Sequence, residues 1–167
     1  MRRALTFLAV FCALGLAAGA GRAQVDGADL KAAYIFNFAL FTTWPDAPAS
    51  ARAPLVVCAS PDHPLWPRLA ALNGKPVNGR PWSVTDIGHP KAVRCDIVVL
   101  ARTAQPPATA AGVLVVRDGA ARDGSRGAVV TLVEDDEHIR FDIDTQEAAR
   151  SGLRLSSRLL RLARNVQ

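Results

Sequence analysis

The first apolar stretch of the chain beyond its opening residues predicts a helix that is apolar almost all the way round. On a helical period, one face holds Tyr34, Asn37, Phe38, Phe41 and Trp44, and the other holds Ala33, Phe36, Leu40 and Thr43. Such a helix must be buried on two sides or covered by a partner. Only thirteen residues separate Lys31 from Pro45, whereas a membrane span needs about 20. We expect Pro45 to end this helix, the first of a domain that begins near Asp26.

Further along, short apolar runs predict strands separated by helical or polar connections. The runs with the character of buried parallel strands are Leu55–Ala59, Cys95–Ala101 and Gly112–Asp118. Pro81–Thr85 alternates like a half-exposed strand, Pro64–Leu72 has a helical pattern, and Thr103–Ala111 is a weak crossover broken by prolines. Strands that alternate with crossovers indicate an α/β sheet.

Two later runs, Ala128–Val133 and His138–Ile143, predict a β-hairpin around the acidic connection Glu134–Glu137. In this hairpin Ile139, Phe141 and Ile143 face inward, and Arg140 and Asp142 face outward. A calcium loop needs a glycine that bends it, and none is present here, so we interpret the acidic connection as a solvated hairpin tip.

At its C-terminal end the chain has the pattern of an amphipathic helix. Ser156 or Ser157 can cap it. Its inward residues would be Leu159, Leu160, Leu162, Ala163 and Val166, opposite Arg158, Arg161 and Arg164. The arginines form either a solvated face or a cationic surface for an acidic partner or a membrane. The fold class is therefore α/β: a single-domain mixed β-sheet with flanking helices and a C-terminal β-hairpin followed by an amphipathic helix.

Residues 1–23 have the pattern of a secretory signal peptide. Arg2 and Arg3 precede an apolar region from Ala4 to Ala18, and Gly21-Arg-Ala23 is a small-residue cleavage site. The alternative is a membrane anchor. We expect cleavage near Ala23, which leaves residues 24–167 as one exported domain.

Export changes the charge balance. The whole chain carries a net charge of +5, and loss of its three leader arginines leaves 17 basic and 15 acidic residues, a net charge of +2. This balance does not favour a nucleic-acid-binding protein. The 144 residues that remain are enough to bury a core.

After removal of Cys12 with the leader, two cysteines remain, Cys58 and Cys95. In an oxidising compartment two cysteines permit one intrachain disulfide, and each lies at a predicted strand. A structural bridge is the favoured interpretation; redox sensing and metal binding are the alternatives.

We find no motif of a catalytic or cofactor site in the sequence. There is no G-x-S-x-G, P-loop, H-E-x-x-H or dinucleotide-binding glycine pattern, and His63, His89 and His138 lie in loops without an evident nucleophile beside them. We therefore predict a protein that is not an enzyme and has neither a cofactor nor a metal. Asn37 is expected to be a buried structural amide that ties its helix to a neighbouring backbone.

Several blocks of the sequence together resemble the YfiR family of small periplasmic proteins. They occur in the same order and span essentially the whole exported chain: Lys31–Phe38 with Trp44-Pro45, Cys58 at the end of the first strand, Cys95-Asp-Ile97, Gly127 before Ala128-Val-Val130, Ile139–Ile143 and Gly152–Ala163.

The resemblance implies a periplasmic repressor that binds the periplasmic portion of an inner-membrane diguanylate cyclase and lowers cyclic di-GMP. It also implies an outer-membrane lipoprotein that relieves repression. Of two bridges in YfiR, only that between Cys58 and Cys95 has its counterparts here. A homodimer remains open, and the alternative function is a periplasmic small-molecule sensor without a cyclase partner.

Partner contacts of such a repressor should combine exposed apolar residues with arginines. The candidate partner-binding residues are Tyr34, Phe38, Phe41, Trp44, Arg158 and Arg161.

Overall fold

The structure is a computed structural model that describes residues 27–45, 53–88, 94–108, 111–120, 127–135 and 138–167. The proposed signal peptide and its cleavage site lie outside these residues. The described helices are α1 (Gly27–Leu40), α2 (Trp66–Ala70), α3 (Thr145–Arg150) and α4 (Ser157–Leu160). The strands are β1 (Thr42–Thr43), β2 (Leu55–Ala59), β3 (Pro76–Val77), β4 (Arg80–Asp86), β5 (Ile97–Ala101), β6 (Leu114–Asp118), β7 (Val130–Asp135), β8 (His138–Ile143), β9 (Arg154–Leu155) and β10 (Asn165–Val166).

Eight of the strands in the described ranges form one mixed sheet in the order β10-β8-β7-β6-β5-β2-β4-β3. Strands β4, β2, β5, β6 and β7 are parallel to one another, whereas β8 pairs antiparallel with β7 and β3 antiparallel with β4. Strands β1 and β9 make a separate antiparallel pair. The predicted α/β class, the parallel strands and the hairpin are confirmed.

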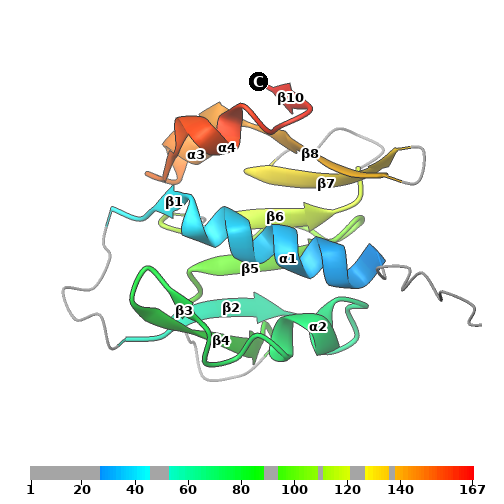
Figure 1. Ribbon diagram of the computed structural model, residues 1–167, viewed down its shortest axis with the longest axis vertical. Helices are drawn as coiled ribbons and strands as arrows, with labels where there is room; N and C mark the ends of the chain where they lie inside the picture. Colours follow the sequence, from blue (N-terminus) through cyan, green and yellow to red (C-terminus); the bar gives the residue numbers. More distant parts are fainter. Residues whose placement is uncertain (1–26, 46–52, 89–93, 109–110, 121–126, 136–137) are drawn as a thin grey trace, which may run out of the picture.

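Helix α1 lies across one face of this sheet (Figure 1). Its fully buried residues Ile35 and Phe38 belong to the main core, together with the inward-facing side chains of β2, β5, β6 and β7. The ring of Phe38 packs against Phe141 of β8 with a centroid distance of 4.9 Å. Because its apolar side chains cover the sheet, α1 is a core element of the domain.

The opposite face of the sheet has a smaller core of its own. It contains Cys58 of β2, Val98 and Leu100 of β5, and Val115 of β6, each less than 5% exposed. Successive strand residues alternate between the two cores, so the central strands are buried on both faces. This explains why they appear in the sequence as continuous apolar runs.

Helix α1 ends at Leu40, five residues before the proline that we expected to end it. The hydroxyl of Thr42 donates to the carbonyl of Phe38 at 2.7 Å, and Thr42 and Thr43 then pair with Leu155 and Arg154. The two β-branched threonines favour this extended pairing over another helical turn.

The predicted C-terminal amphipathic helix is wrong beyond its first turn. Ser156 caps α4 as expected, by accepting a hydrogen bond from the backbone N–H of Leu159 at 3.2 Å. After α4 the chain returns to β8, where Arg164 N donates to Phe141 O and Gln167 N donates to Ile143 O. This pairing satisfies backbone N–H and C=O groups at the open edge of β8. They would stay unpaired if the segment continued as a longer helix. Leu162 and Val166 are therefore 66% and 45% exposed, instead of facing inward.

Helix α3 was missed by the sequence prediction. Its N-cap is Asp144, whose carboxylate accepts a hydrogen bond from Glu147 N at 2.9 Å. An N-cap aspartate followed three residues later by glutamate is a helix-start signal that the sequence does contain.

Among the described helices, none has the length and apolar character to cross a bilayer.

Candidate functional site

Charged side chains gather where the parallel strands end. Asp118 is the last residue of β6, Glu134 lies near the end of β7, and Lys31 reaches both from the N-terminal half of α1. Lys31 Nζ is 2.8 Å from Asp118 Oδ1 and 2.6 Å from Glu134 Oε1. The Lys31 and Asp118 side chains are only 13% and 14% exposed. This cluster therefore joins α1 to two strands through a largely shielded ion pair.

The protonation states of the cluster follow from its burial and its charges. Burial opposes the positive charge of Lys31, but the attraction of Asp118 and Glu134 outweighs it, and the pKa of Lys31 is raised. The contact with Lys31 lowers the pKa of Glu134. Within the described residues Asp118 Oδ1 has no aligned hydrogen bond, so its contact with Lys31 is an ion pair only. Lys31 and Glu134 are thus both charged at neutral pH.

A buried histidine lies close to this cluster. His63, in the connection between β2 and α2, is 5% exposed. Its Nδ1 accepts a hydrogen bond from Leu65 N at 3.1 Å, so Nε2 carries the proton of the neutral ring. Among the described residues Nε2 has no hydrogen-bond partner of good geometry. Burial lowers the pKa of His63, against the opposing attraction of Asp118, and the ring is neutral at physiological pH.

Lys31, His63, Asp118 and Glu134 include no hydroxyl or thiol that could act as a nucleophile. In the part of the chain that the structure describes, no group of three His, Cys, Asp or Glu residues is placed to hold a metal ion. We assign the cluster to fixing the position of α1. Sequence reasoning did not find this cluster, because Lys31 and Asp118 are brought together only by the order of the strands.

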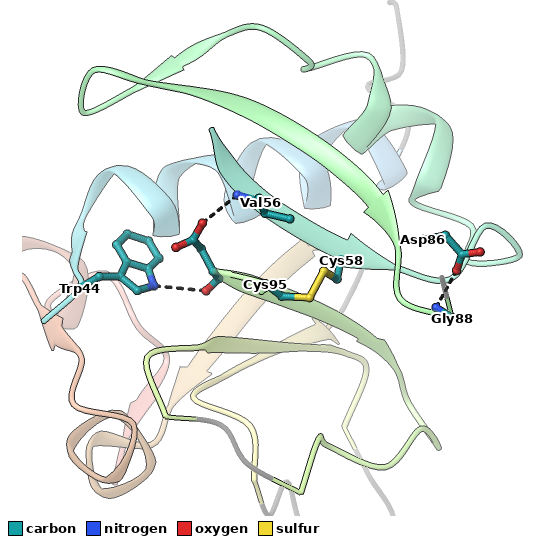
Figure 2. The surroundings of a disulfide bond; sticks show 7 residues. Trp44, Val56, Cys58, Asp86, Gly88 and Cys95 are labelled. Atoms are coloured by element: carbon teal, nitrogen blue, oxygen red, sulfur yellow. Dashed lines mark hydrogen bonds between the residues drawn. A yellow bond between two sulfur atoms is a disulfide. The ribbon is translucent and has the colours of Figure 1, made fainter. Parts of the chain in front are cut away.

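The disulfide joins two neighbouring parallel strands, β2 and β5. Cys58 of β2 and Cys95, just before β5, are bonded, with Cα atoms 5.8 Å apart (Figure 2). Strands β2 and β5 are neighbours in the sheet, as a disulfide between them requires. Cys58 is 1% exposed, so the bridge is part of the second core.

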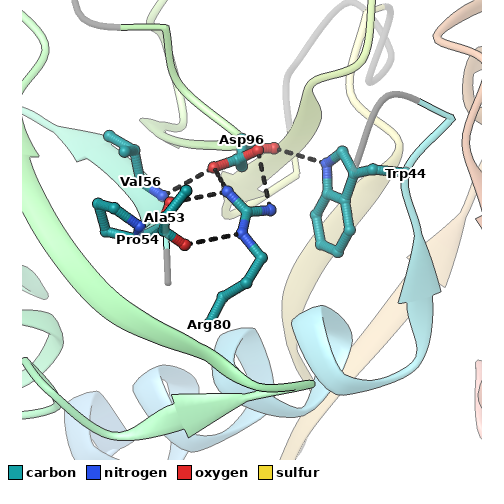
Figure 3. Close-up of polar contacts among 6 residues, drawn as sticks. All are labelled: Trp44, Ala53, Pro54, Val56, Arg80 and Asp96. Atoms are coloured by element: carbon teal, nitrogen blue, oxygen red, sulfur yellow. Dashed lines mark hydrogen bonds and ion pairs between the residues drawn. The ribbon is translucent and has the colours of Figure 1, made fainter. Parts of the chain in front are cut away.

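Beside the disulfide, a second ion pair lies where these strands begin. Arg80 of β4 donates from Nη2 to Asp96 Oδ2 at 2.6 Å and from Nη1 to Asp96 Oδ1 at 3.2 Å. Arg80 also donates to the carbonyls of Ala53 and Pro54 (Figure 3). The Arg80 and Asp96 side chains are 10% and 17% exposed. This bidentate pair links the beginnings of three strands.

The Asp96 residue is further fixed by its neighbours. Its carboxylate accepts from Val56 N at 2.8 Å, and its backbone carbonyl accepts from Trp44 Nε1 at 3.2 Å. A cavity of about 290 Å³ opens beside this network. The sequence prediction missed both, because Arg80 and Asp96 are brought together only by the order of the strands.

The structure separates the predicted partner-binding residues into two groups. Phe38 is fully buried and Trp44 is 8% exposed, so the expectation that these two face a partner is wrong. Tyr34 and Phe41 are half-buried, and both pack against the main core. Arg158 and Arg161 are exposed on α4 and at its C-cap. The predicted residues therefore do not form one surface.

Asn37 is exposed on the outer side of α1, which also carries Leu30 and Ala33. The expectation of a buried structural amide is wrong, because α1 buries the side centred on Ile35 and Phe38. Asn37 is more than a quarter-turn away from that side.

The fold and its contacts define a disulfide-bonded, single-domain mixed α/β protein. The model of the YfiR/HmsC-like family matches residues 28–164, which is most of the chain, so the chain belongs to that family. None of the curated proteins matches the chain. Family membership confirms the resemblance seen in the sequence blocks. It indicates a periplasmic regulator of diguanylate cyclase signalling, in a family of regulators that is not a known class of enzyme.

Proposed function

We propose that this protein represses an inner-membrane diguanylate cyclase by binding its periplasmic portion, which lowers cyclic di-GMP. The observation that carries the proposal is the family match over residues 28–164. A repressor of this kind binds one state of its target better than another, and about 1–3 kcal/mol of difference changes the output severalfold or more.

The C-terminal turn is the surface that fits this role best. Arg158 lies in α4, Arg161 is its C-cap and Leu162 follows in the turn after it, so the three residues belong to one short segment of the chain. Leu162 is 66% exposed, more than any other large hydrophobic side chain in the described ranges. Arginines around an exposed leucine combine charge and apolar area, as interface anchors do.

Arg158 and Arg161 differ from the neighbouring arginines in their ion pairing. Arg150 pairs with Glu147 at 2.9 Å, and Arg164 pairs with Asp142 at 2.6 Å. Neither Arg158 nor Arg161 makes an ion pair with another described residue. Their charges are therefore available to an acidic surface on the cyclase. We call Arg158, Arg161 and Leu162 the C-terminal contact surface.

Two further partners follow from the same proposal. An outer-membrane lipoprotein that relieves repression would compete for the protein, and a homodimer would present two C-terminal contact surfaces. Both stay predictions.

The proposal is tested by deleting the gene in a strain that expresses the partner cyclase. Cyclic di-GMP should rise, with more biofilm and less swimming, and expression of the protein in the periplasm should reverse the rise. If cyclic di-GMP stays at the parental level in the deletion strain, the proposed repression is refuted.

A further inference from the structure

We infer that His63 is a pH switch: its neutral ring fixes the turn between β2 and α2, and its protonation in mild acid releases that turn. We call residues Ser60–Leu65 the His63 turn. The turn is closed when the ring contacts Leu65, and open when this contact is broken. The inference does not depend on the proposed cyclase repression, since it concerns a different part of the molecule from the C-terminal contact surface.

Helix α2 begins without a capping side chain at its N-cap. The residue at that position is Leu65, which makes no side-chain capping hydrogen bond. The first backbone N–H groups of a helix need acceptors from outside it, and His63 supplies two of them. Its Nδ1 accepts from Leu65 N at 3.1 Å, and its carbonyl oxygen accepts from Trp66 N at 2.8 Å. His63 therefore takes the place of an N-cap side chain.

The contact between the ring and Leu65 requires a neutral imidazole. Nδ1 is an acceptor only while it has no proton, because both nitrogens of a charged ring are donors. Nε2 holds the proton of the neutral ring, since Nδ1 accepts from Leu65 N. An added proton therefore has to bind Nδ1, where it would face the N–H of Leu65. Two donors repel each other, so the closed turn is incompatible with a charged ring.

The surroundings of the ring favour its neutral form in the closed turn. His63 is 5% exposed, and among the described residues Nε2 has no hydrogen-bond partner of good geometry. Of the described charged groups, Asp118 of β6 attracts a proton to the ring and Lys31 of α1 opposes it, while Leu100 of β5 presents a backbone carbonyl. Burial outweighs the attraction of Asp118, so the pKa of His63 is lowered.

Acid favours the open turn because the ring titrates differently in the two states. In the open turn the ring reaches water and has an ordinary pKa of about 6.5, whereas in the closed turn its pKa is lower. Below pH 6.5 the ratio of open to closed turn therefore rises by up to about tenfold per pH unit, until the pH reaches the pKa of the closed form.

The opening should stay local to the turn and the start of α2. Leu65 is 1% exposed and belongs to the main core, so its side chain becomes accessible when the turn opens. Leu69, one helical turn further along, is held separately, because Trp82 Nε1 of β4 donates to its carbonyl at 3.1 Å. The acid form would thus present an apolar side chain that the neutral form buries, while the sheet stays in place.

The switch is tested by amide hydrogen exchange of the oxidised, ¹⁵N-labelled protein purified from the periplasm, between pH 7.5 and 5.0. Protection factors, which are corrected for the intrinsic effect of pH on exchange, are compared. The protection of the Leu65 amide should fall by up to about tenfold per pH unit below pH 6.5. At pH 5.0 it should be at least roughly tenfold below that of the Leu114 amide, which donates to Asp96 O at 2.9 Å in the central sheet.

Variants identify the group that takes up the proton. His63→Asn keeps an acceptor near the position of Nδ1 but has no titratable ring, so the protection of Leu65 should lose its pH dependence. The matched control is His138→Asn, which removes an exposed histidine at the start of β8 and should keep the pH dependence of the unaltered protein. Should His63→Asn fail to fold, the measurements on the unaltered protein still decide.

Three results would overturn the switch, whether or not the deletion strain shows repression. The first is an equal protection of Leu65 at pH 7.5 and 5.0 in the unaltered protein. The second is a protection of Leu65 equal to that of Leu114 at pH 5.0, because the turn would then open only when the whole domain unfolds. The third is a pH dependence that persists in His63→Asn.

Discussion

Helix α1 and the C-terminal contact surface differ in a way that the amino-acid pattern conceals. Both combine large apolar residues with basic ones, and sequence reasoning assigned residues of each to a partner: aromatic residues of the first helical stretch, and Arg158 and Arg161 near the C-terminus. In the structure the apolar residues of α1 fill the main core and Lys31 is held by two carboxylates. In the C-terminal contact surface Leu162 is exposed, and the two arginines have no ion-pair partner among the described residues. The same residue types thus serve folding in one region and are available for binding in the other.

The largest effect that tests this contrast is expected at Phe38. Phe38→Ala removes a fully buried ring that packs against Tyr34 and Phe141, and should lower the free energy of unfolding by about 3–5 kcal/mol. Urea unfolding followed by fluorescence measures it. The control on the outer side of the same helix is Asn37→Ala, with an expected change within about 0.5 kcal/mol. Similar small changes in both variants would show that α1 is not a core element.

Removal of the disulfide should have the next largest effect. The bridge joins residues 37 positions apart, and its loss in Cys58→Ala/Cys95→Ala should destabilise the protein by about 2–4 kcal/mol. Urea unfolding of this variant, compared with the oxidised protein, gives the value. Thiol labelling of denatured, unreduced protein from the periplasm should find both cysteines blocked; two labelled thiols would contradict the bridge.

Lys31→Met keeps the aliphatic length of the side chain and removes its charge. Asp118 would then be left largely buried without its cation, at an expected cost of about 1–3 kcal/mol in unfolding free energy. Glu134→Gln is the matched control, because the Glu134 side chain is 70% exposed, and exposed ion pairs contribute little. A double variant with Asp118→Asn should cost less than the sum of the two single changes. Strict additivity would mean that the ion pair contributes nothing.

His63 should give the protein a moderate dependence on mild acid. Its folded pKa is lowered from 6.5, so the unfolded state binds the proton more readily. The contribution of the neutral ring is present above pH 6.5 and is lost as pH falls from there toward the folded pKa. Unfolding free energies measured between pH 7.5 and 5.5 should therefore decrease, and His63→Gln should flatten this slope. If the unfolding free energy of His63→Gln falls with pH as steeply as that of the unaltered protein, groups other than His63 cause the pH dependence.

Local patterns sufficed to predict the central strands and the hairpin. The runs at Leu55–Ala59 and Gly112–Asp118 are apolar on both faces because both cores bury them, and this is visible in sequence. The serine cap of α4 was also predicted correctly. The N-cap signal at Asp144 was present and overlooked.

Contacts between distant segments could not be derived from such patterns. The Lys31–Asp118 and Arg80–Asp96 ion pairs depend on which strands are neighbours. Local sequence patterns do not reveal the order of the strands. The C-terminal helix was overpredicted because Leu159–Val166 has helical periodicity, while the open edge of β8 competes for the same residues. Tertiary pairing outweighed local propensity there.

The central claim is that the C-terminal contact surface binds the cyclase, and the most direct test is the affinity of the purified protein for the periplasmic portion of that cyclase. We predict that Arg158→Glu/Arg161→Glu weakens binding at least roughly tenfold, since two charges are reversed at the contact. Its unfolding free energy should stay unchanged within about 0.5 kcal/mol, because both side chains are exposed. Lys75→Glu, an exposed charge reversal between α2 and β3, should bind like the unaltered protein. Unchanged affinity in the double variant would contradict the claim.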